Sequence, residues 1–196
     1  MLRVNRILCN ILATALEFAA VSSDFVLLAS TITASASSVS FDGYFSSTYD
    51  NYVIYINNLN LATGSQYPQV RFRRSNADVT ASNYRFSSGR LMRSSGGSDV
   101  AAGENGWDQS YIRLTQDSDN ATVTSHSYII QIPNPLDTGV YPSIIFDGHS
   151  TNYTNTDYYR RFGFGRLATT GALSGISFFS SSGNITGRFK LYGIKA

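Results

Sequence analysis

Short runs in which apolar and polar residues alternate, separated by turn-forming residues, limit what this chain can fold into more than any other feature. In Val70-Arg71-Phe72-Arg73 and in Arg188-Phe189-Lys190-Leu191-Tyr192, the apolar side chains recur at every second position, as on one face of a strand. From Phe25 onward such runs follow one another with no helical segment between them. The expected strands are Phe25–Thr33, Ser37–Phe41, Asn51–Asn57, Gln69–Arg74, Tyr84–Met92, Ser110–Thr115, Val123–Ile132, Tyr141–Phe146, Tyr158–Leu167, Gly175–Phe179 and Ile185–Ile194.

Composition supports the same fold class. The chain holds two Glu and two Lys against eleven Asp and thirteen Arg, so the charged residues that best form helices are scarce. Thirteen Tyr and twelve Phe are residues that favour strands. A length of 196 residues suits one domain. We therefore expect an all-β fold, an antiparallel, jelly-roll-like β-sandwich over residues 25–196 with an N-terminal helix.

Residues 1–24 differ from the rest and are expected to form a helical attachment segment. They are rich in Leu, Ala and Ile, contain no Gly or Pro, and repeat apolar residues at helical spacing. Two other interpretations stay open: a secretory signal, because Arg3 and Arg6 precede the apolar run and Ala19-Ala20 resembles a cleavage region, or a start codon placed upstream of natural folding near Asp24. The candidate assembly residues are Leu8, Ile11, Leu12, Ala15, Leu16 and Ala19.

Residues that could carry catalysis or bind metal are few, and we predict no catalytic residue, metal or cofactor. With one cysteine, Cys9, neither an intrachain disulfide nor a Cys-based metal site can form. His126 is expected to be a half-exposed strand residue, and His149 to lie in a turn. Asp117-Ser118-Asp119-Asn120 offers oxygen ligands for Ca²⁺, but it lacks the distal Glu of a calcium loop, so a solvated turn is favoured. Gly163-Phe164-Gly165 indicates a bulge or close packing within a strand.

Charge and hydropathy favour neither nucleic-acid binding nor a membrane-spanning helix. The net charge is +2, which is too small to predict nucleic-acid binding. No run of eighteen or more apolar residues occurs, so we expect no membrane-spanning helix.

Two segments are expected to contact partners: a long loop at Ser87–Gly106 and a second loop at Ser150–Asp157. The tyrosines around the second loop stand among Asn, Asp and Arg, a setting that suits sugar stacking, a protein interface, or burial of alternate rings in the core. The candidate outer-contact residues are Arg90, Arg93, Tyr153, Tyr158, Tyr159 and Arg160.

The C-terminal segment Ile185–Lys195 resembles a recurrent ending of small virion proteins of tailed phages, especially marine phages, in which a "G-x-F-x-LYGIK" strand closes a β-sandwich. The opening Phe25–Thr31, followed by Val39–Phe41 and Tyr49–Ile54, resembles the same family. The segment Val70–Ser75 is similar to that family's "LRFR" strand. The resemblance covers residues 25–196 and includes no catalytic signature.

This resemblance implies a non-enzymatic virion component displayed on the particle surface, as a tail fibre, an appendage or a head decoration. Its partners would be other virion proteins, and we expect a homo-oligomer, a trimer, with outer loops that contact host-surface glycan or neighbouring subunits. One alternative is a secreted, lectin-like glycan-binding module. A weaker alternative is a glycan-cleaving enzyme, which requires paired carboxylates in a groove.

Overall fold

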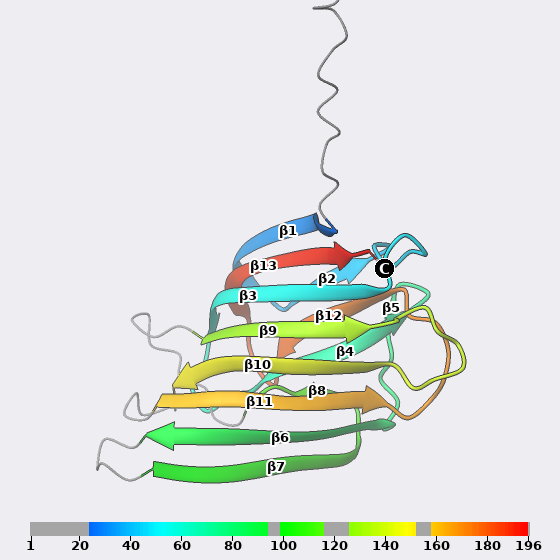
Figure 1. Cartoon of the computed structure of the whole chain (residues 1–196). Coiled ribbons are helices and arrows are strands. Elements are labelled where there is room, and N and C mark those ends of the chain that lie inside the picture. The colour runs from blue at the N-terminus through cyan, green and yellow to red at the C-terminus, as the bar shows by residue number, and fades with distance from the viewer. Residues whose placement is uncertain (1–23, 94–98, 116–125, 152–157, 196) are drawn as a thin grey trace, which may run out of the picture.

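Two antiparallel β-sheets face each other in a sandwich-like arrangement (Figure 1). The structure, a computed structural model, describes residues 24–93, 99–115, 126–151 and 158–195, and these ranges contain no helix. The expected N-terminal helix, its six candidate assembly residues, Tyr153 and Asp117–Asn120 lie outside the described residues. The all-β, antiparallel, sandwich-like part of the prediction is confirmed.

The larger sheet has eight strands and forms the nearer layer in Figure 1. Every neighbouring pair in it is antiparallel, and β1 and β7 are its two edges. In spatial order the strands are β1 (Phe25–Ala36), β13 (Ile185–Ile194), β3 (Asn51–Leu61), β9 (His126–Pro133), β10 (Ser143–Thr151), β11 (Tyr158–Leu167), β6 (Tyr84–Arg93) and β7 (Asp99–Gln109).

The smaller sheet has five strands and lies behind the larger one (Figure 1). Its order is β2 (Ser38–Asp42), β12 (Gly175–Ser180), β4 (Pro68–Arg74) and β5 (Ala77–Asp78), with β8 (Ile112–Arg113) pairing with β4. Strands from the first half of the chain pair with strands from the second half: β3 with β13, β4 with β12, and β6 with β11.

The core lies between the sheets and follows from the alternation along each strand. In β9 and β13 every second side chain is buried, so one face of each strand packs inward and the other faces outward. The small sheet contributes a second apolar face, since β12 is buried along most of its length. The largest fully buried side chains include Tyr52, Tyr84, Tyr128, Phe72, Phe146, Phe189, Ile54 and Ile130.

The predicted loop at Ser87–Gly106 is wrong. Residues 87–93 belong to β6 and residues 99–106 to β7, and the two strands pair over a long antiparallel register. The β7 sequence DVAAGENGWDQ lacks a period-two apolar pattern, which is why it resembled a loop. Gly106 is required in this strand because a Cβ there would overlap the ring of Phe86.

Two expectations for the histidines are also wrong. His126 is fully buried, because it has the same parity as Tyr128 and Ile130 on the inner face of β9, and its Nδ1 accepts a hydrogen bond from the Thr151 backbone N–H at 3.3 Å. His149 lies within strand β10 and is exposed, instead of forming a turn.

Close packing is the correct interpretation of the Gly163-Phe164-Gly165 run. A Cβ on Gly163 would lie 2.6 Å from the backbone oxygen of Ser87, and one on Gly165 would lie 2.6 Å from the side chain of Ile112. The register of β11 with its neighbour β10 runs through this segment without a shift.

Candidate binding site

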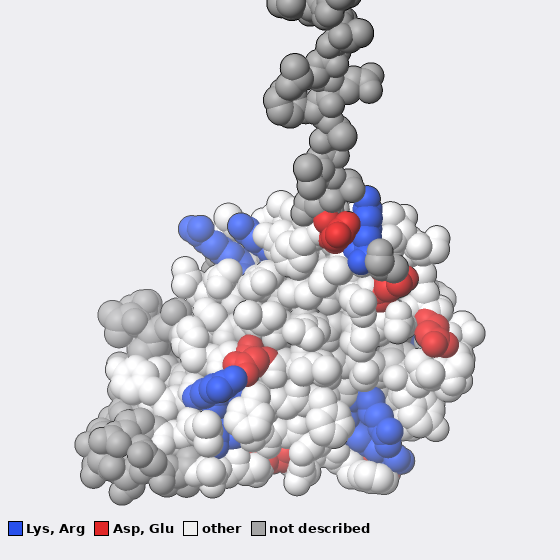
Figure 2. Space-filling view, in the orientation of Figure 1, with Lys and Arg blue, Asp and Glu red and all other residues white. Residues whose placement is uncertain are grey.

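The outer face of the eight-stranded sheet exposes large apolar side chains from its central strands. Ile129 of β9, Ile145 of β10, and Phe162 and Phe164 of β11 all point away from the core, and Ile145 and Phe164 are 53% and 52% exposed. Figure 2 shows this side of the molecule, with few charged side chains on it. Exposed apolar side chains gathered on one face in this way are typical of binding surfaces.

The strand register arranges these outward side chains in a row across the sheet. Gln131 lies opposite Ile145, Ile145 opposite Phe164, Phe164 opposite Ser87, and Ser87 opposite Asn105. The row crosses five strands, β9, β10, β11, β6 and β7, and so ends at the β7 edge.

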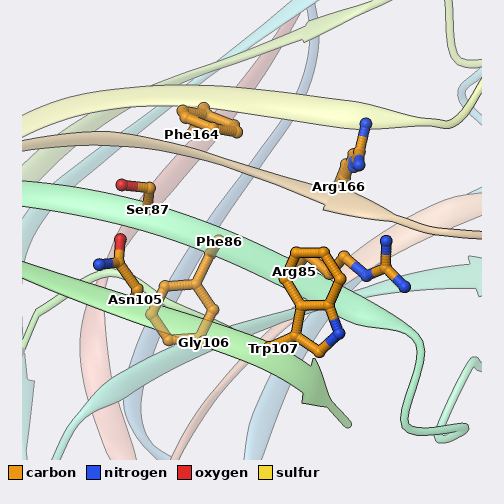
Figure 3. A pocket seen from close by; sticks show the side chains of 8 residues that line it. All are labelled: Arg85, Phe86, Ser87, Asn105, Gly106, Trp107, Phe164 and Arg166. Atoms are coloured by element: carbon orange, nitrogen blue, oxygen red, sulfur yellow. The ribbon is translucent and has the colours of Figure 1, made fainter.

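A cavity of about 480 Å³ lies at that edge (Figure 3). Its volume falls within the range of about 300–1,000 Å³ that is usual for small-molecule sites. The cavity, called the Trp107 pocket below, is lined by Arg85, Phe86, Ser87, Asn105, Gly106, Trp107, Phe164 and Arg166.

Trp107 presents the largest flat aromatic surface of this pocket. Its side chain is 66% exposed, and the Arg85 guanidinium lies 3.8 Å from the centre of its ring system. An arginine stacked on an indole holds the ring in place through a cation–π contact. A second contact of Arg85, at 3.6 Å from Asp108, adds a weak ion pair at the rim.

Two arginines meet at the pocket without a carboxylate among its lining residues. Arg85 and Arg166 are directly opposite in the register of β6 and β11. Like charges in that position repel each other and destabilise a sheet. Arg166 lies 5.4 Å from the ring of Tyr141, and it makes no ion pair within the described ranges of the chain. The pocket is therefore suited to an anionic group.

A second cavity, of about 720 Å³, continues the pocket across the sheet, because Phe164 lines both. Gln131, Ile145 and Phe162 also line it, so it is largely uncharged. Asp147 is its one charged lining residue, and this carboxylate accepts a hydrogen bond of 2.6 Å from Arg160, a contact that raises the pKa of Arg160. The two cavities together form an elongated groove, called the outer groove below.

The sequence-predicted contact residues do not come together at this pocket. Tyr158 is 65% exposed and Arg160 is exposed, whereas Tyr159 is buried, so for Tyr159 an outer contact is contradicted. Arg90 is half-buried with its guanidinium 5.4 Å from the Tyr159 ring, and Arg93 ends β6. The Trp107 pocket was not predicted; the available signal was the single Trp of the chain, between Gly106 and Asp108.

A group of buried polar side chains lies inside the sandwich. Arg161 is 3% exposed, lies 3.6 Å from Glu104, donates from Nε to the Ser150 hydroxyl at 3.2 Å, and stands 4.3 Å from the Tyr159 ring. Burial lowers the pKa of Arg161, and the nearby Tyr128 and Glu104 partly offset that shift. Burial also disfavours the charged form of Tyr128, which for a tyrosine raises the pKa. The contacts of Arg161 connect β7, β10 and β11 from within.

Two carboxylates also converge on the smaller sheet, where one arginine forms an ion pair with each of them. Arg73 Nε lies 2.8 Å from Asp42, and Arg73 Nη1 lies 2.5 Å from Asp78. Burial lowers the pKa of Arg73, but the hydrogen bonds to these two carboxylates outweigh it, so the net shift is upward. Within the described part of the chain, no three His, Cys, Asp or Glu side chains gather in a way that could hold a metal ion.

Comparison with known proteins gave no relative: no family model matches the chain, and the search of curated proteins found no match. Among the residues that the structure describes, no helix is long and apolar enough to cross a membrane.

Proposed function

We propose that the chain is a non-enzymatic structural protein of a bacteriophage virion, displayed on the particle as a tail fibre, appendage or capsid decoration. It acts by assembling with other virion proteins, including copies of itself in a trimer, and by binding through its outer face. The observation that carries the proposal is the nature of strand β1, a twelve-residue edge strand without a charged residue or a proline.

An edge strand of this kind is a template for pairing with another chain, because among the described strands of the sheet β1 pairs along one side only, with β13. Ile32 and Leu27 of β1 are 70% and 49% exposed. Natural edges are usually protected by charges, and the opposite edge, β7, follows that rule with Asp108. The unprotected β1 edge therefore favours assembly at that side of the domain.

The position of β1 supports attachment and display at opposite ends. Residues 1–24 lead directly into β1, and the proposed attachment helix lies in that segment. The Trp107 pocket lies at the other edge, seven strand spacings or about 33 Å away. A subunit held at β1 thus presents its outer groove away from the attachment point.

The finer description of the fold as jelly-roll-like belongs to the same proposal. Its support is the pairing of early strands with late ones, β3 with β13, β4 with β12 and β6 with β11, as in a chain wrapped from both ends. The resemblance of residues 25–196 to small phage virion proteins is the second support.

Immunogold labelling and mass spectrometry of purified particles test the function. We expect antibody to the folded domain to label the particle, and the chain to co-purify with portal, capsid or tail proteins. Recovery of the chain only from particle-free medium, with a cleaved N-terminus, would instead favour the secreted lectin-like module. The exposed Trp107 pocket is the observation that favours that second candidate.

A further inference from the structure

We propose that the Trp107 pocket and the outer groove bind an acidic oligosaccharide, one of whose sugars carries a carboxylate. This inference rests on the proposed function, because it names the chemistry that the displayed face would recognise. Aromatic stacking, two arginines with no carboxylate among the residues that line the pocket, an amide and a hydroxyl side chain, and a groove longer than one sugar all point to this ligand.

Stacking comes from Trp107 and Phe164. Both rings are more than half exposed, and they stand on opposite sides of the pocket, on β7 and β11 (Figure 3). Arg85 fixes the indole by stacking on it at 3.8 Å. A flat, apolar ring held rigidly at the surface packs well against the C–H face of a sugar ring, at little cost in conformational entropy.

The anionic group is assigned by Arg85 and Arg166. Their cross-strand position places both arginines on neighbouring strands at the pocket, and the Nε of Arg85 is buried with no hydrogen-bond partner among the described residues. A carboxylate placed between them would accept hydrogen bonds from both guanidinium groups and would relieve their repulsion. A neutral sugar would leave that repulsion in place.

Ser87 and Asn105 supply groups for sugar hydroxyls. They lie opposite each other on β6 and β7, and Ser87 is also opposite Phe164 on β11, so both are on the aromatic row. A Ser hydroxyl and an Asn amide can each donate and accept, which matches the mixed character of sugar hydroxyls.

The outer groove extends the site beyond one sugar. From Phe164 the second cavity leads over Ile145 to Gln131, with no unpaired cation along it. Single-stranded nucleic acid is disfavoured, because it requires positive charge along the whole groove, whereas here the arginines lie at one end and Asp147 lines the other part.

A fluorescence titration tests the inference directly, because Trp107 is the only tryptophan of the chain. The full-length protein is titrated with sialyl-lacto-N-neotetraose, which carries one carboxylate on its terminal sugar, with lacto-N-neotetraose as the same chain without that acidic sugar, and with the oligonucleotide dT8. We expect sialyl-lacto-N-neotetraose to change the Trp107 emission and to bind at least about tenfold more tightly than lacto-N-neotetraose. No response to sialyl-lacto-N-neotetraose, or tighter binding of dT8, would overturn the inference.

Three variants locate the interaction. Arg166→Gln should weaken sialyl-lacto-N-neotetraose binding about tenfold and leave lacto-N-neotetraose binding unchanged, since it removes only the anion contact. Trp107→Ala should abolish binding of both sugars. Because this variant has no tryptophan fluorescence, its binding is measured by calorimetry. Arg188→Gln removes an exposed arginine of β13, on the same face but far from the pocket, and should change neither. Equal losses in Arg166→Gln and Arg188→Gln would indicate a general charge effect and contradict the site.

The same variants separate this inference from the function on which it rests. Trp107→Ala and Arg166→Gln should be incorporated into particles as fully as the wild type, with unchanged thermal midpoints. If the wild type is incorporated into particles normally but does not bind the acidic sugar, only the inference about the ligand is overturned. Absence of the wild-type chain from particles, with sugar binding retained, would overturn the virion role alone.

Discussion

Two neighbouring arginines of β11 show how completely strand parity decides a residue's environment. Arg160 points outward and its side chain is 64% exposed beside Asp147, whereas Arg161 points inward and is 3% exposed. The same residue type therefore contributes to a surface ion pair at one position and to the interior of the sandwich at the next.

Replacing Arg161 by Leu should destabilise the protein by about 3 kcal/mol. The change leaves the Glu104 carboxylate beside an apolar side chain and removes the hydrogen bond to the Ser150 hydroxyl. Urea unfolding followed by circular dichroism measures the effect. The double variant Arg161→Leu/Glu104→Leu should recover much of the loss, because no buried charge then loses its partner.

Arg160→Leu is the matched control for that experiment, since it removes the same side chain one position away. Surface ion pairs contribute little, so the unfolding midpoint should stay close to that of the wild type. Equal destabilisation by Arg160→Leu and Arg161→Leu would contradict the assignment of Arg161 to the interior.

The buried hydroxyl of Tyr84 should make the free energy of unfolding fall at alkaline pH. This hydroxyl accepts a hydrogen bond from the Phe72 backbone N–H at 3.0 Å and donates one to the Val79 carbonyl at 3.0 Å. Burial raises its pKa above the ordinary value of about 10, and burial raises the pKa of Tyr128 as well. In the unfolded chain these tyrosines lose their protons from about pH 10, while in the folded protein they keep them.

The free energy of unfolding should therefore be unaffected by these tyrosines below about pH 10, and should fall as the pH rises further. The slope is at most about 1.4 kcal/mol per pH unit for each tyrosine. Urea unfolding of the wild type and Tyr84→Phe between about pH 9 and pH 11 checks this. Tyr84→Phe should be less stable at pH 9, because the Phe72 N–H loses its acceptor, but should have a shallower alkaline slope. Identical slopes would contradict the role of Tyr84.

At the level of elements, Gly163 of β11 sets the distance between this strand and β6. A Cβ on Gly163 would lie 2.6 Å from the Ser87 backbone oxygen and 2.8 Å from the Ser88 Cα, and backbone atoms in a paired strand cannot move aside. Gly163→Ala should thus separate β11 from β6 and destabilise the protein by about 1–3 kcal/mol. Thermal unfolding, compared with Gly103→Ala, measures this effect.

Gly103 of β7 is the control because a Cβ there would meet its nearest neighbour, the Ser88 oxygen, at 3.5 Å, an ordinary contact. Gly103→Ala should therefore leave the thermal midpoint nearly unchanged. A Gly163→Ala variant as stable as Gly103→Ala would show that β11 and β6 can separate without cost.

Which elements could be predicted from the sequence depended on whether a strand buries a face of large side chains. β11 and β13 were predicted with the bounds that the structure gives, and β4 and β12 to within one residue, because aromatic and branched residues alternate in them or fill them. The start of β3 was also predicted, but this strand continues four residues beyond the predicted Asn57. β7 could not be predicted, since the Phe86 ring covers its Gly106 and thus supplies the apolar contact that β7 itself lacks. The Trp107 pocket was missed for the same reason, because it forms only when β7 pairs with β6 and β11 pairs with β6.

At the scale of the whole molecule, the proposed assembly and the proposed ligand binding take place at opposite edges of the eight-stranded sheet. β7 carries charged residues and the pocket, whereas β1 carries neither and leads to residues 1–24. The outer face near β1 carries an aromatic cluster beside the exposed Arg188 and Lys190 of β13: Phe25 stacks on Tyr192 at 4.4 Å, and Tyr55 packs edge-on against both rings. Assembly at β1 would bury this surface and leave the outer groove open.

A charge placed on the β1 edge should therefore prevent assembly. Ile32, 70% exposed on β1, is changed to Lys, which adds one positive charge per copy beside Arg188, its partner in the β1–β13 register. Pairing of copies through this edge would bring those charges together, and lysine is a residue that natural edges use to prevent pairing.

Size-exclusion chromatography with light scattering should give a trimeric mass for the full-length wild type and a monomeric mass for Ile32→Lys. Leu91→Lys, which adds the same charge at a 49% exposed position of β6, should stay trimeric. A monomeric wild type, or an Ile32→Lys variant that still forms trimers, would show that β1 is not the assembly edge.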